Sequence, residues 1–381
     1  MSDGTRDAAW WCSLRSNLKN WYDQSHRDLP WRETHDPYRI WISEIMLQQT
    51  QVATVINYYH RFLDAFPDVQ ALASADEQEV LALWAGLGYY RRARQMHAAA
   101  KGIVEELGGQ FPSTLEGVLD LPGVGRYTAG AITSFAYDLP SPILEANTIR
   151  LFSRLIKLEE DVTKRESQTK LWEFAGELVA VEKRSPGKLN QAAMELGSQV
   201  CVPKSPSCTS CPVSKICPTF HDGLQDRIPK PKAKKQYIDQ SHVLVAVQRK
   251  GKLLMRQNQK GEWWEGLWDF PRAALPKFLK NQKQIKSLTP IQEVLEEELR
   301  SRFSLSFVCN SWFHSLKHAV TKYKIQLHCY TAELDDKLPS GEDHWKWFKP
   351  SEAAELPLTA SAKRVLKQCN RQMDAKKSML S

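Results

Sequence analysis

Four of the eight cysteines of this chain lie within seventeen residues. They are Cys201, Cys208, Cys211 and Cys217, so the spacing is C-x6-C-x2-C-x5-C. One such group in a reducing compartment favours a metal site over a disulfide framework. A structural zinc ion and an iron–sulfur cluster are the two alternatives for this site. Zinc ribbons usually have two C-x2-C pairs, and this chain has one, so the spacing favours an iron–sulfur cluster. The spacing matches neither common ferredoxin pattern, so we expect a structural role.

A second feature is a tight glycine turn in Leu121–Ile132, LPGVGRYTAGAI, where Gly123 and Gly125 flank a valine between two apolar helical stretches. The first N–H groups of the second helix are exposed, and glycines let backbone donors approach a ligand closely. The turn can therefore bind a phosphate. A plain helical hairpin without a ligand is the alternative, since G-x-G turns are common.

The composition bounds the class of protein that carries these features. The chain has 381 residues, 42% hydrophobic and 25% charged, with a net charge of +8. This length predicts two domains, and the charge suits an anionic partner such as nucleic acid. No run of about 18 apolar residues could span a bilayer, so we expect no membrane association. The first residues lack the pattern of a secretory signal, which predicts a cytoplasmic protein, nucleoid-associated if bacterial.

Hydrophobic periodicity predicts the elements that position these residues. Residues 10–220 read as helical, with long 3.6-residue periods in Ile42–Phe66 and Glu77–Leu107. Residues 226–240, DRIPKPKAKKQYIDQ, read as an exposed basic linker. Beyond it lie alternating and β-branched runs, one helical stretch near 290–300, and a frayed polar tail over the last dozen residues. We therefore predict an all-α domain at 1–225 and an α+β domain at 241–370.

Taken together, the glycine turn and the cysteine spacing resemble the helix-hairpin-helix DNA glycosylases of the endonuclease III superfamily. Two further segments, WISEIMLQQTQVATV (Trp41–Val55) and GLGYYRRAR (Gly86–Arg94), resemble its adenine DNA glycosylase (MutY) branch. The resemblance is dense over residues 29–217 and looser beyond. It implies a [4Fe–4S] cluster held by the four cysteines, and an α + (α+β) architecture in which a Nudix-like domain follows the helical one.

The resemblance also implies how a glycosidic bond would be cut. Where the endonuclease III branch carries a nucleophilic lysine after the hairpin, this chain has Tyr127, so hydrolysis without strand cleavage is expected. Glu44 corresponds to the acid that protonates adenine at N7, and its apolar neighbours should raise its pKa; a glutamate paired on the helix surface is the alternative. Glu145 stands where the family has aspartate, and it stabilises the sugar cation or forms a transient adduct. Asn147 supports it.

This position is the main departure from the family pattern. Glu145 moves the carboxylate by about 1.5 Å, and displacements near 1 Å can cost about 100-fold in rate. Ala146 replaces a family glycine. These changes predict either a readjusted pocket or a slow enzyme with altered substrate preference.

Other residues are assigned to DNA by the same resemblance. Gln49 and Tyr89 insert into the duplex, with Leu87 beside them, to offset the cost of flipping a base. The walls of the adenine pocket are Arg27, Trp31, Leu47, Gln191 and Met194, although Trp31 and Met194 could equally be core residues. Lys204 and Lys215 are expected to contact phosphates, with solvated surface charge as the alternative.

The C-terminal half resembles a Nudix-like domain that recognises 8-oxoguanine. WWEGLWDFP (Trp263–Pro271) fits its opening strand and loop, while QEVLEEELR lacks the arginine and glycine of a pyrophosphate hydrolase, although Glu293, Glu296 and Glu297 remain as possible metal ligands. The family's Phe-Ser-His loop corresponds to Val320, Thr321 and Lys322. Thr321 keeps the hydroxyl, and Lys322 replaces an imidazole by a point charge. A surface hairpin without DNA contact is the alternative.

These expectations describe a monofunctional glycosylase that removes adenine mispaired with 8-oxoguanine or guanine in double-stranded DNA, acting as a monomer. One rival is an enzyme of the same scaffold with altered base preference or reduced activity. Another is a mismatch-binding protein without catalysis. A third, a Nudix hydrolase tethered to a DNA-binding domain, is opposed by the missing arginine and glycine.

Overall fold

The computed structural model describes residues 6–180, 185–231, 236–276, 291–338 and 344–378. By its internal contacts the chain divides into two compact units, Met1–Ser74 with Gln95–Ala233, and Ala75–Arg94 with Lys234–Ser381. The expected order of a helical half followed by an α+β half is confirmed. Within the described ranges, no helix is both long and apolar enough to cross a membrane.

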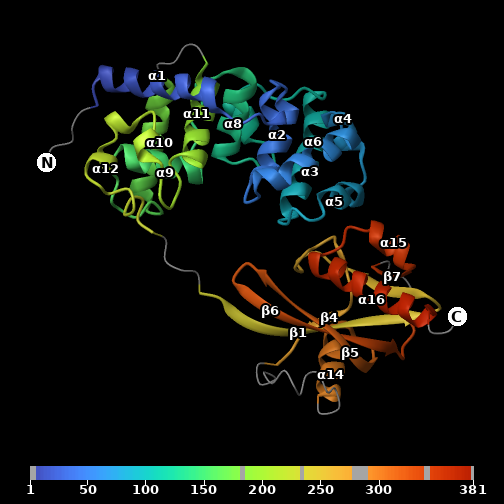
Figure 1. Cartoon of the computed structure of the whole chain (residues 1–381). Helices are drawn as coiled ribbons and strands as arrows, with labels where there is room; N and C mark the ends of the chain where they lie inside the picture. Colours follow the sequence, from blue (N-terminus) through green and yellow to red (C-terminus); the bar gives the residue numbers. More distant parts are fainter. Residues whose placement is uncertain (1–5, 181–184, 232–235, 277–290, 339–343, 379–381) are drawn as a thin grey trace. The chain divides into compact units, whose positions relative to one another are not determined.

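The first unit consists of helices (Figure 1). In chain order they are α1 (Ala8–Ser25), η1 (Pro30–Arg32), α2 (Pro37–Leu47), α3 (Val52–Ala65), α4 (Val69–Ser74), α6 (Arg91–Leu107), α7 (Leu115–Leu119), α8 (Arg126–Tyr137), α9 (Ala146–Leu155), α10 (Arg165–Ala180), α11 (Pro186–Gln199), η2 (Cys208–Ser210), η3 (Ser214–Ile216) and α12 (Pro218–His221). Helix α6 begins in the second unit and continues in the first.

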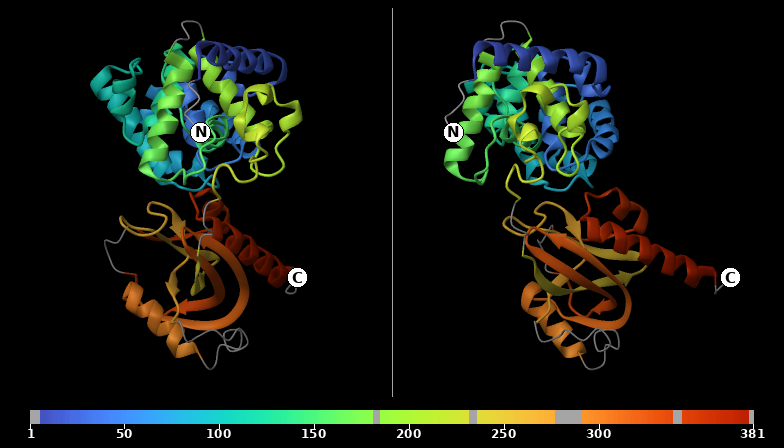
Figure 2. Two further views of the ribbon diagram at one scale, coloured as in Figure 1. Left: turned by 90° about the vertical axis from the view of Figure 1, so that its left-hand side faces the viewer. Right: turned by 60° about the vertical axis from the view of Figure 1, so that its left-hand side comes forward.

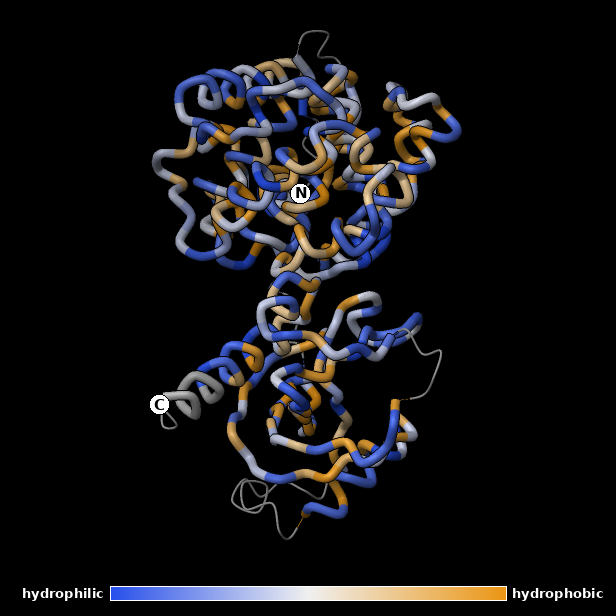
Figure 3. Tube along the Cα trace, turned by 90° about the vertical axis from the view of Figure 1, so that its right-hand side faces the viewer, coloured by the Kyte–Doolittle hydropathy of each residue, from blue (hydrophilic) through white to orange (hydrophobic). Residues whose placement is uncertain are grey.

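Local sequence explains where these helices begin. Asp7 and Asp36 cap α1 and α2 by accepting hydrogen bonds from the first turn, and Pro37 occupies the first position of α2, where its missing N–H costs nothing. Along the helices apolar and polar stretches alternate (Figure 3), as expected when one side of each helix is buried. The fully buried Trp41, Phe62 and Phe174 are among the largest side chains of this unit's core.

Two predicted helical periods are interrupted in the structure. The period Ile42–Phe66 is divided between α2 and α3, and Gln49 between them has φ 58°. The period Glu77–Leu107 is divided between α5 (Glu77–Trp84) and α6, with positive φ at Gly86, Gly88 and Tyr89. Left-handed residues cannot continue an α-helix, so both stretches turn at these points.

The second unit is built on one sheet with helices on both faces (Figure 2). The strands are β1 (Ile238–Arg249), β2 (Lys252–Gln257), β3 (Trp268–Asp269), β4 (Arg272–Ala274), β5 (Phe307–Val320), β6 (Tyr323–Leu334) and β7 (Trp345–Phe348). The order is β3-β2-β1-β6-β5, with β4 paired to β1 and β7 to β2. Only the pair β1–β6 is parallel among these described strands.

Each face of this sheet has its own core. Helix α14 (Gln292–Phe303) packs on one face through Leu295 and Leu299, together with Phe307. Helices α15 (Pro350–Glu355) and α16 (Ala360–Ser378) cover the other face through residues that include Val365 and Leu366. Two sequence expectations are corrected here. Helix α16 continues into the segment that we expected to fray, up to Ser378.

The second correction concerns the predicted linker at 226–240. Ile228 is buried, and its carbonyl oxygen accepts a hydrogen bond from Arg154 Nε at 2.8 Å, so the start of this segment packs on the helical unit. Strand β1 begins at Ile238, inside the predicted linker. Residues 232–235 of the linker and Pro290 of the predicted helix lie outside the described residues.

Candidate active site

A cavity of about 510 Å³ opens in the helical unit. Its lining comes from the segment before α2, from α2 and the turn after it, from the start of α8, from the start of α9 and from α11. Drug-sized and nucleobase-sized ligands occupy pockets of roughly 300–1,000 Å³. Ten residues assigned from the sequence line this cavity: Glu44, Tyr127, Glu145, Asn147, Arg27, Trp31, Leu47, Gln49, and, from α11, Gln191 and Met194.

Glu44 lies on α2 with only 3% of its surface exposed. Burial raises the pKa of Glu44 to about 7, although the hydrogen bond from the Tyr127 hydroxyl to its Oε2, at 2.7 Å, acts in the opposite direction. The nearby charge of Glu145 raises this pKa further. A carboxyl group with a pKa near neutrality can donate a proton at physiological pH and take it back later.

Tyr127 occupies the second position of α8, directly after the glycine turn. Burial is the main cause that raises the pKa of its hydroxyl well above the usual value, so the hydroxyl stays protonated and donates to Glu44. The same hydroxyl lies 3.9 Å from Met194 Sδ. Tyr127 therefore fixes the orientation of the Glu44 carboxyl group inside the pocket.

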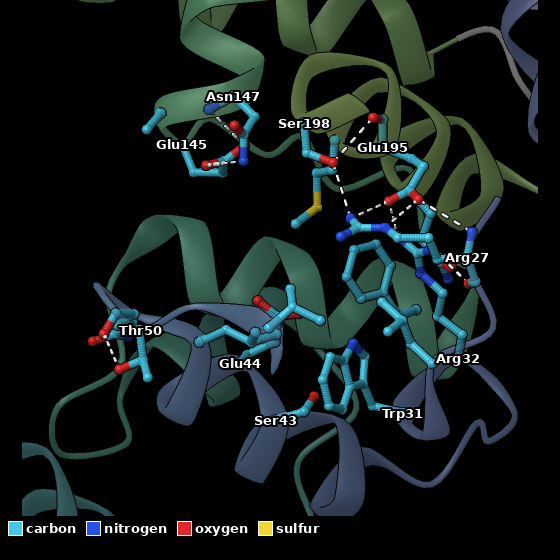
Figure 4. A pocket seen from close by; sticks show the side chains of 18 of the residues that line it. Arg27, Trp31, Arg32, Ser43, Glu44, Thr50, Glu145, Asn147, Glu195 and Ser198 are labelled. Carbon is cyan, nitrogen blue, oxygen red and sulfur yellow. Dashed lines mark hydrogen bonds and ion pairs between the residues drawn. The ribbon is translucent and has the colours of Figure 1, made fainter. Parts of the chain in front are cut away.

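Glu145 caps the N-terminus of α9. Its Oε1 accepts the backbone N–H groups of Asn147 at 2.9 Å and Thr148 at 3.0 Å, and its Oε2 accepts Asn147 Nδ2 at 3.2 Å. The Thr148 hydroxyl accepts the Glu145 N–H at 2.8 Å, which completes a capping box. Burial raises the pKa of Glu145, and these hydrogen bonds limit the rise. Figure 4 shows Glu145 beside Asn147 on one wall of the pocket and Glu44 on another.

A third carboxylate, Glu195 on α11, was missed by the sequence reasoning. Burial alone would raise its pKa, but hydrogen bonds from Arg27 and Arg32 lower the pKa of Glu195 to about 2. Its oxygens accept Arg27 Nε, Arg27 Nη2 and Arg32 Nη2, each at 2.7 Å (Figure 4). This ion network holds the wall that Arg27 forms. Its spacing of one helical turn from Gln191 places it on the same face of α11, but its partners Arg27 and Arg32 are distant in the sequence.

The remaining pocket walls include apolar side chains, amides and the hydroxyls of Ser43, Thr50 and Ser198. Trp31 is 8% exposed and packs edge-on against Tyr59, with ring centroids 5.5 Å apart. The Gln191 Oε1 atom accepts the Tyr22 hydroxyl at 2.5 Å, which orients the amide. Trp31 therefore both lines the pocket and belongs to the core, so the two alternatives for it do not exclude each other.

The predicted DNA-inserting residues have unusual backbones. Gln49 and Tyr89 are both exposed, with φ 58° and 48°, while Leu87 is 6% exposed. In the hairpin, Gly123 has φ +80°, and a Cβ there would lie 2.7 Å from Gln95 Cβ, so glycine is required. Gly125 has open space beside it, and no side chain caps the N-terminus of α8. The first N–H groups of α8 are therefore available to an anion.

The four clustered cysteines line a second, small cavity. Among the described residues, no three His, Cys, Asp or Glu side chains are placed to hold a single metal ion. Four thiolates are a known ligand set for zinc as well as for an iron–sulfur cluster. Four sulfur donors around one cavity fit the chemistry of an iron–sulfur cluster, which takes four thiolates around a larger group.

Two arginines connect this cysteine loop to α9. Arg154 is 3% exposed and donates to Cys201 Sγ at 3.1 Å and to Val202 O at 3.0 Å. Arg150 donates to Cys201 O at 2.6 Å and to Asn147 Oδ1 at 2.9 Å. Because Asn147 also holds Glu145, a chain of hydrogen bonds runs from the cysteine loop to the pocket carboxylate.

In the second unit, Thr321 and Lys322 are exposed in the turn between β5 and β6, where Thr321 has φ 50°. Two of the three glutamates on α14 that the sequence analysis considered as metal ligands have partners within this unit. Glu296 Oε1 accepts Gln292 Nε2 and the Cys309 N–H, both at 2.9 Å, and Glu297 lies 3.5 Å from Arg300. Glu293 is exposed on the same helix.

Comparison with known proteins gives two family matches. The family described as HhH-GPD superfamily base excision DNA repair protein matches residues 42–177, and the NUDIX domain family matches residues 242–368. The chain is similar to a mouse protein named adenine DNA glycosylase, 47% identical over 223 residues, which are 56% of this chain and 43% of that protein. The chain thus spans less than half the length of this relative.

A second relative is matched over more of its length. It is the adenine DNA glycosylase of Buchnera aphidicola subsp. Schizaphis graminum, 35% identical over 67% of this chain and 73% of that protein. Among solved structures, a thermostable thymine-DNA glycosylase matches with a TM-score of 0.51 and 28% identity, covering 56% of this chain and 97% of the other. The likeness of sequence and of fold is densest over the helical unit that contains the pocket.

Proposed function

The chain belongs to the adenine DNA glycosylases, and on this premise we propose that it hydrolyses the N-glycosidic bond of adenine mispaired with 8-oxoguanine or guanine in double-stranded DNA. The products are free adenine and an abasic site. The observation that carries the proposal is the buried Glu44, hydrogen-bonded to Tyr127 in a pocket of about 510 Å³, which has room for a nucleobase.

Glu44 acts as the general acid. Cleavage of a glycosidic bond leaves the base with a developing negative charge and the sugar as a cation-like species. A proton from Glu44 to the adenine ring at N7 makes the base a better leaving group, and the pKa of about 7 keeps a large fraction of Glu44 protonated near neutral pH. The Tyr127 hydroxyl keeps the carboxyl group in place.

Glu145 stabilises the sugar cation, by charge or by a transient covalent adduct. Its carboxylate is held at the N-terminus of α9 by three hydrogen bonds, and a group fixed in this way needs no reorganisation when charge develops. Asn147 supports Glu145 through both its backbone and its side chain.

The reaction stops at base removal. Strand cleavage by this scaffold needs an amine that attacks the sugar and forms a Schiff base. Among the described residues that line the pocket, none is a lysine, and Tyr127 stands at the position after the hairpin. The proposed enzyme is therefore monofunctional.

The cysteine loop would hold a [4Fe–4S] cluster through Cys201, Cys208, Cys211 and Cys217. Such a cluster would order the loop, and Lys204 and Lys215 on this loop would contact phosphates. Gln49 would insert into the duplex, and so would Tyr89, which has Leu87 nearby in the chain, while Gly123 and Gly125 bring the start of α8 to the DNA backbone. We propose that the protein acts as a monomer.

The second unit serves recognition rather than hydrolysis. Thr321 would contact the oxidised base through its hydroxyl, and Lys322 would contact a phosphate or the base edge. The hydrogen bonds that occupy Glu296 support a binding role over metal-dependent pyrophosphate cleavage.

One observation favours a second candidate, a mismatch-binding protein with little turnover. Both oxygens of Glu145 already accept hydrogen bonds within α9, and burial raises its pKa, so less of it is charged than an exposed carboxylate would be. Either property would slow the step that needs an anion beside the sugar.

Single-turnover assays separate these candidates. Duplexes with adenine opposite 8-oxoguanine, guanine, cytosine or thymine are incubated with excess protein, and free adenine and strand breaks are measured. We expect adenine release opposite 8-oxoguanine and guanine, with no strand break before alkali treatment. Tight mismatch binding without release by the wild type, and release by Glu145→Asp, would instead assign the second candidate.

A further inference from the structure

One end of the sheet in the second unit carries an exposed tryptophan backed by other rings. Trp263 is 40% exposed. Its ring stacks on His242, at 6.2 Å and 10°, and lies tilted against Tyr323 at 5.3 Å. A large aromatic ring is thus held flat at the surface with part of its area open to solvent.

The layer beneath this ring is fixed by a buried cation. Arg272 is 5% exposed; its Nη2 donates to His242 Nδ1 at 3.2 Å and to His318 Nε2 at 3.3 Å, and its guanidinium lies over Trp264 at 4.7 Å. Because both imidazoles accept from a cation, both are neutral. The hydrogen bonds beneath Trp263 are therefore made by neutral imidazoles and do not require their protonation.

Strand register places these groups on one face. Paired residues on neighbouring strands point to the same side, and Tyr323 pairs with Ile238 of β1 and with Val320 of β5. Ile238, which is 44% exposed, therefore extends the apolar floor beside Trp263. Tyr237, the preceding residue, points to the opposite side of the sheet, where Lys324 lies over its ring.

An exposed cation lies beside this floor. The Lys322 ammonium lies 5.5 Å from the Tyr323 ring, and Thr321 is exposed in the same turn. The acidic neighbour Glu262 is neutralised, because it contacts Arg256 at 2.6 Å and Arg302 at 3.2 Å. An exposed flat ring beside an exposed cation is the combination that binds single nucleobases on a DNA strand.

We infer that Trp263, supported by His242 and Tyr323, is a stacking platform for an unpaired nucleobase of DNA, with the Lys322 ammonium on the adjoining phosphate. This inference rests on the proposed function for the choice of DNA as the polymer. It adds a contact that neither the pocket of the helical unit nor the Thr321 hydroxyl provides. This contact works by stacking, so any base can make it, whereas a hydrogen bond from Thr321 recognises one base.

The test compares DNA affinity of full-length Trp263→Ala, Trp263→Phe and Tyr237→Ala. Tyr237 is 43% exposed on the same strand end but on the other face, so Tyr237→Ala is a matched control for loss of an exposed ring. Two duplexes are used, identical except that one carries a single unpaired base. Trp263→Ala should lose roughly 5- to 100-fold in affinity for the duplex with the unpaired base, and much less for the paired duplex.

Trp263→Phe keeps a ring and should retain most of the affinity, and Tyr237→Ala should bind like the wild type. Equal losses for Trp263→Ala and Tyr237→Ala, or equal losses on both duplexes, would overturn the platform. Adenine release from mispairs is measured in parallel. If the wild type releases adenine and Trp263→Ala binds both duplexes like the wild type, the platform is wrong and the proposed function stands. If Trp263→Ala loses affinity only for the duplex with the unpaired base and the wild type releases no adenine, the platform stands and the proposed function is wrong.

Discussion

Two carboxyl groups share one pocket but lie in different surroundings. Glu44 has one hydrogen-bond donor and apolar neighbours, so burial raises its pKa to about 7. Glu145 accepts from two backbone N–H groups and an amide, so the rise of its pKa is limited. Environments that separate the pKa values of two acids assign their roles, one as acid and one as anion.

The rate of adenine release should therefore depend on pH in a bell shape. Glu44 must be protonated, so the single-turnover rate falls as pH rises above about 7. Glu145 must be charged, and its pKa is raised above its ordinary value, so the rate also falls under acidic conditions. A profile without loss on the alkaline side would contradict the role of Glu44.

Ionisation of the buried Glu44 should also lower the stability of the folded protein at neutral and alkaline pH. Its pKa is higher in the folded than in the unfolded state, so the folded protein binds more protons between about pH 4.5 and 7, and stability falls as pH rises through this window. Glu44→Gln has no proton to lose. Its free energy of unfolding minus that of the wild type should be higher at pH 8 than at pH 4 by about 3 kcal/mol, because the variant loses no stability as pH rises. Denaturant unfolding at both pH values measures this difference.

Sequence reasoning reached most pocket residues because they stand in short motifs. Glu44 and Tyr127 could be assigned from their neighbours along the chain, and the structure brings them within 2.7 Å although they lie 83 residues apart. Their roles as acid and support remain predictions. Glu195 was missed, since its importance comes from Arg27 and Arg32, which are distant in sequence and become its partners only in the fold.

At the scale of elements, the N-terminus of α9 determines how Glu145 is presented. Glutamate is not among the preferred capping residues, and here its longer side chain folds back onto the first turn. The alignment of this carboxylate therefore depends on the capping box with Thr148 and on Asn147.

Thr148→Val tests this dependence. The Glu145 N–H loses its buried acceptor, so stability should fall by roughly 1–2 kcal/mol. Adenine release should fall by roughly 10-fold or more, because the carboxylate shifts. Thr169→Val on α10 is the matched control, since its hydroxyl donates to Arg165 O at an exposed site. Equal effects of both substitutions on release would refute the argument.

The link between the cysteine loop and α9 gives another prediction. Arg150→Met removes the hydrogen bonds to Cys201 O and Asn147 Oδ1, so it should lower both the visible absorbance of a bound iron–sulfur cluster and the rate of adenine release. Arg165→Met, an exposed arginine of the same unit, should change neither. If Arg150→Met keeps the full cluster absorbance and the full rate of adenine release, the hydrogen bonds between the cysteine loop and α9 do not support either the cluster or the pocket.

The breaks between helices explain what periodicity could not predict. Apolar periodicity on both sides of Gln48–Gln51 and of Ala85–Tyr90 led to the prediction of two long helical stretches, which the structure divides at these segments. Positive φ angles at Gln49, Gly88 and Tyr89 interrupt them. Backbone geometry of this kind is expected at functional turns, and the residues that we assign to DNA contact lie at these breaks.

At the scale of the whole molecule, the change of period from helical to alternating was enough to predict a helical unit followed by an α+β unit. The exact boundary was not, because the polar, proline-rich composition of residues 226–240 does not reveal that Ile228 is buried or that β1 starts at Ile238. Composition reports average exposure, whereas one buried side chain is decided by its partners in the fold.

The net charge of +8 predicts a strong effect of salt on DNA binding. Removing one lysine that binds a phosphate makes the slope of log affinity against log salt concentration shallower by about one. Lys204→Ala and Lys215→Ala should each reduce the slope by this amount. Lys170→Ala is the control, because Lys170 is exposed and paired with Glu160 at 3.5 Å. An unchanged slope for both loop variants would assign Lys204 and Lys215 to the solvated surface.

The most direct test of the account compares the wild type with Glu44→Gln in single-turnover release of adenine from a duplex with adenine opposite 8-oxoguanine. Glu105→Gln, an exposed glutamate on α6, serves as the control. We predict that the wild type and Glu105→Gln release adenine at the same rate, and that Glu44→Gln is slower by roughly 100-fold or more while still binding the duplex. Release by Glu44→Gln at the wild-type rate, or no release by the wild type, would contradict the assignment of Glu44 as the acid of an adenine glycosylase.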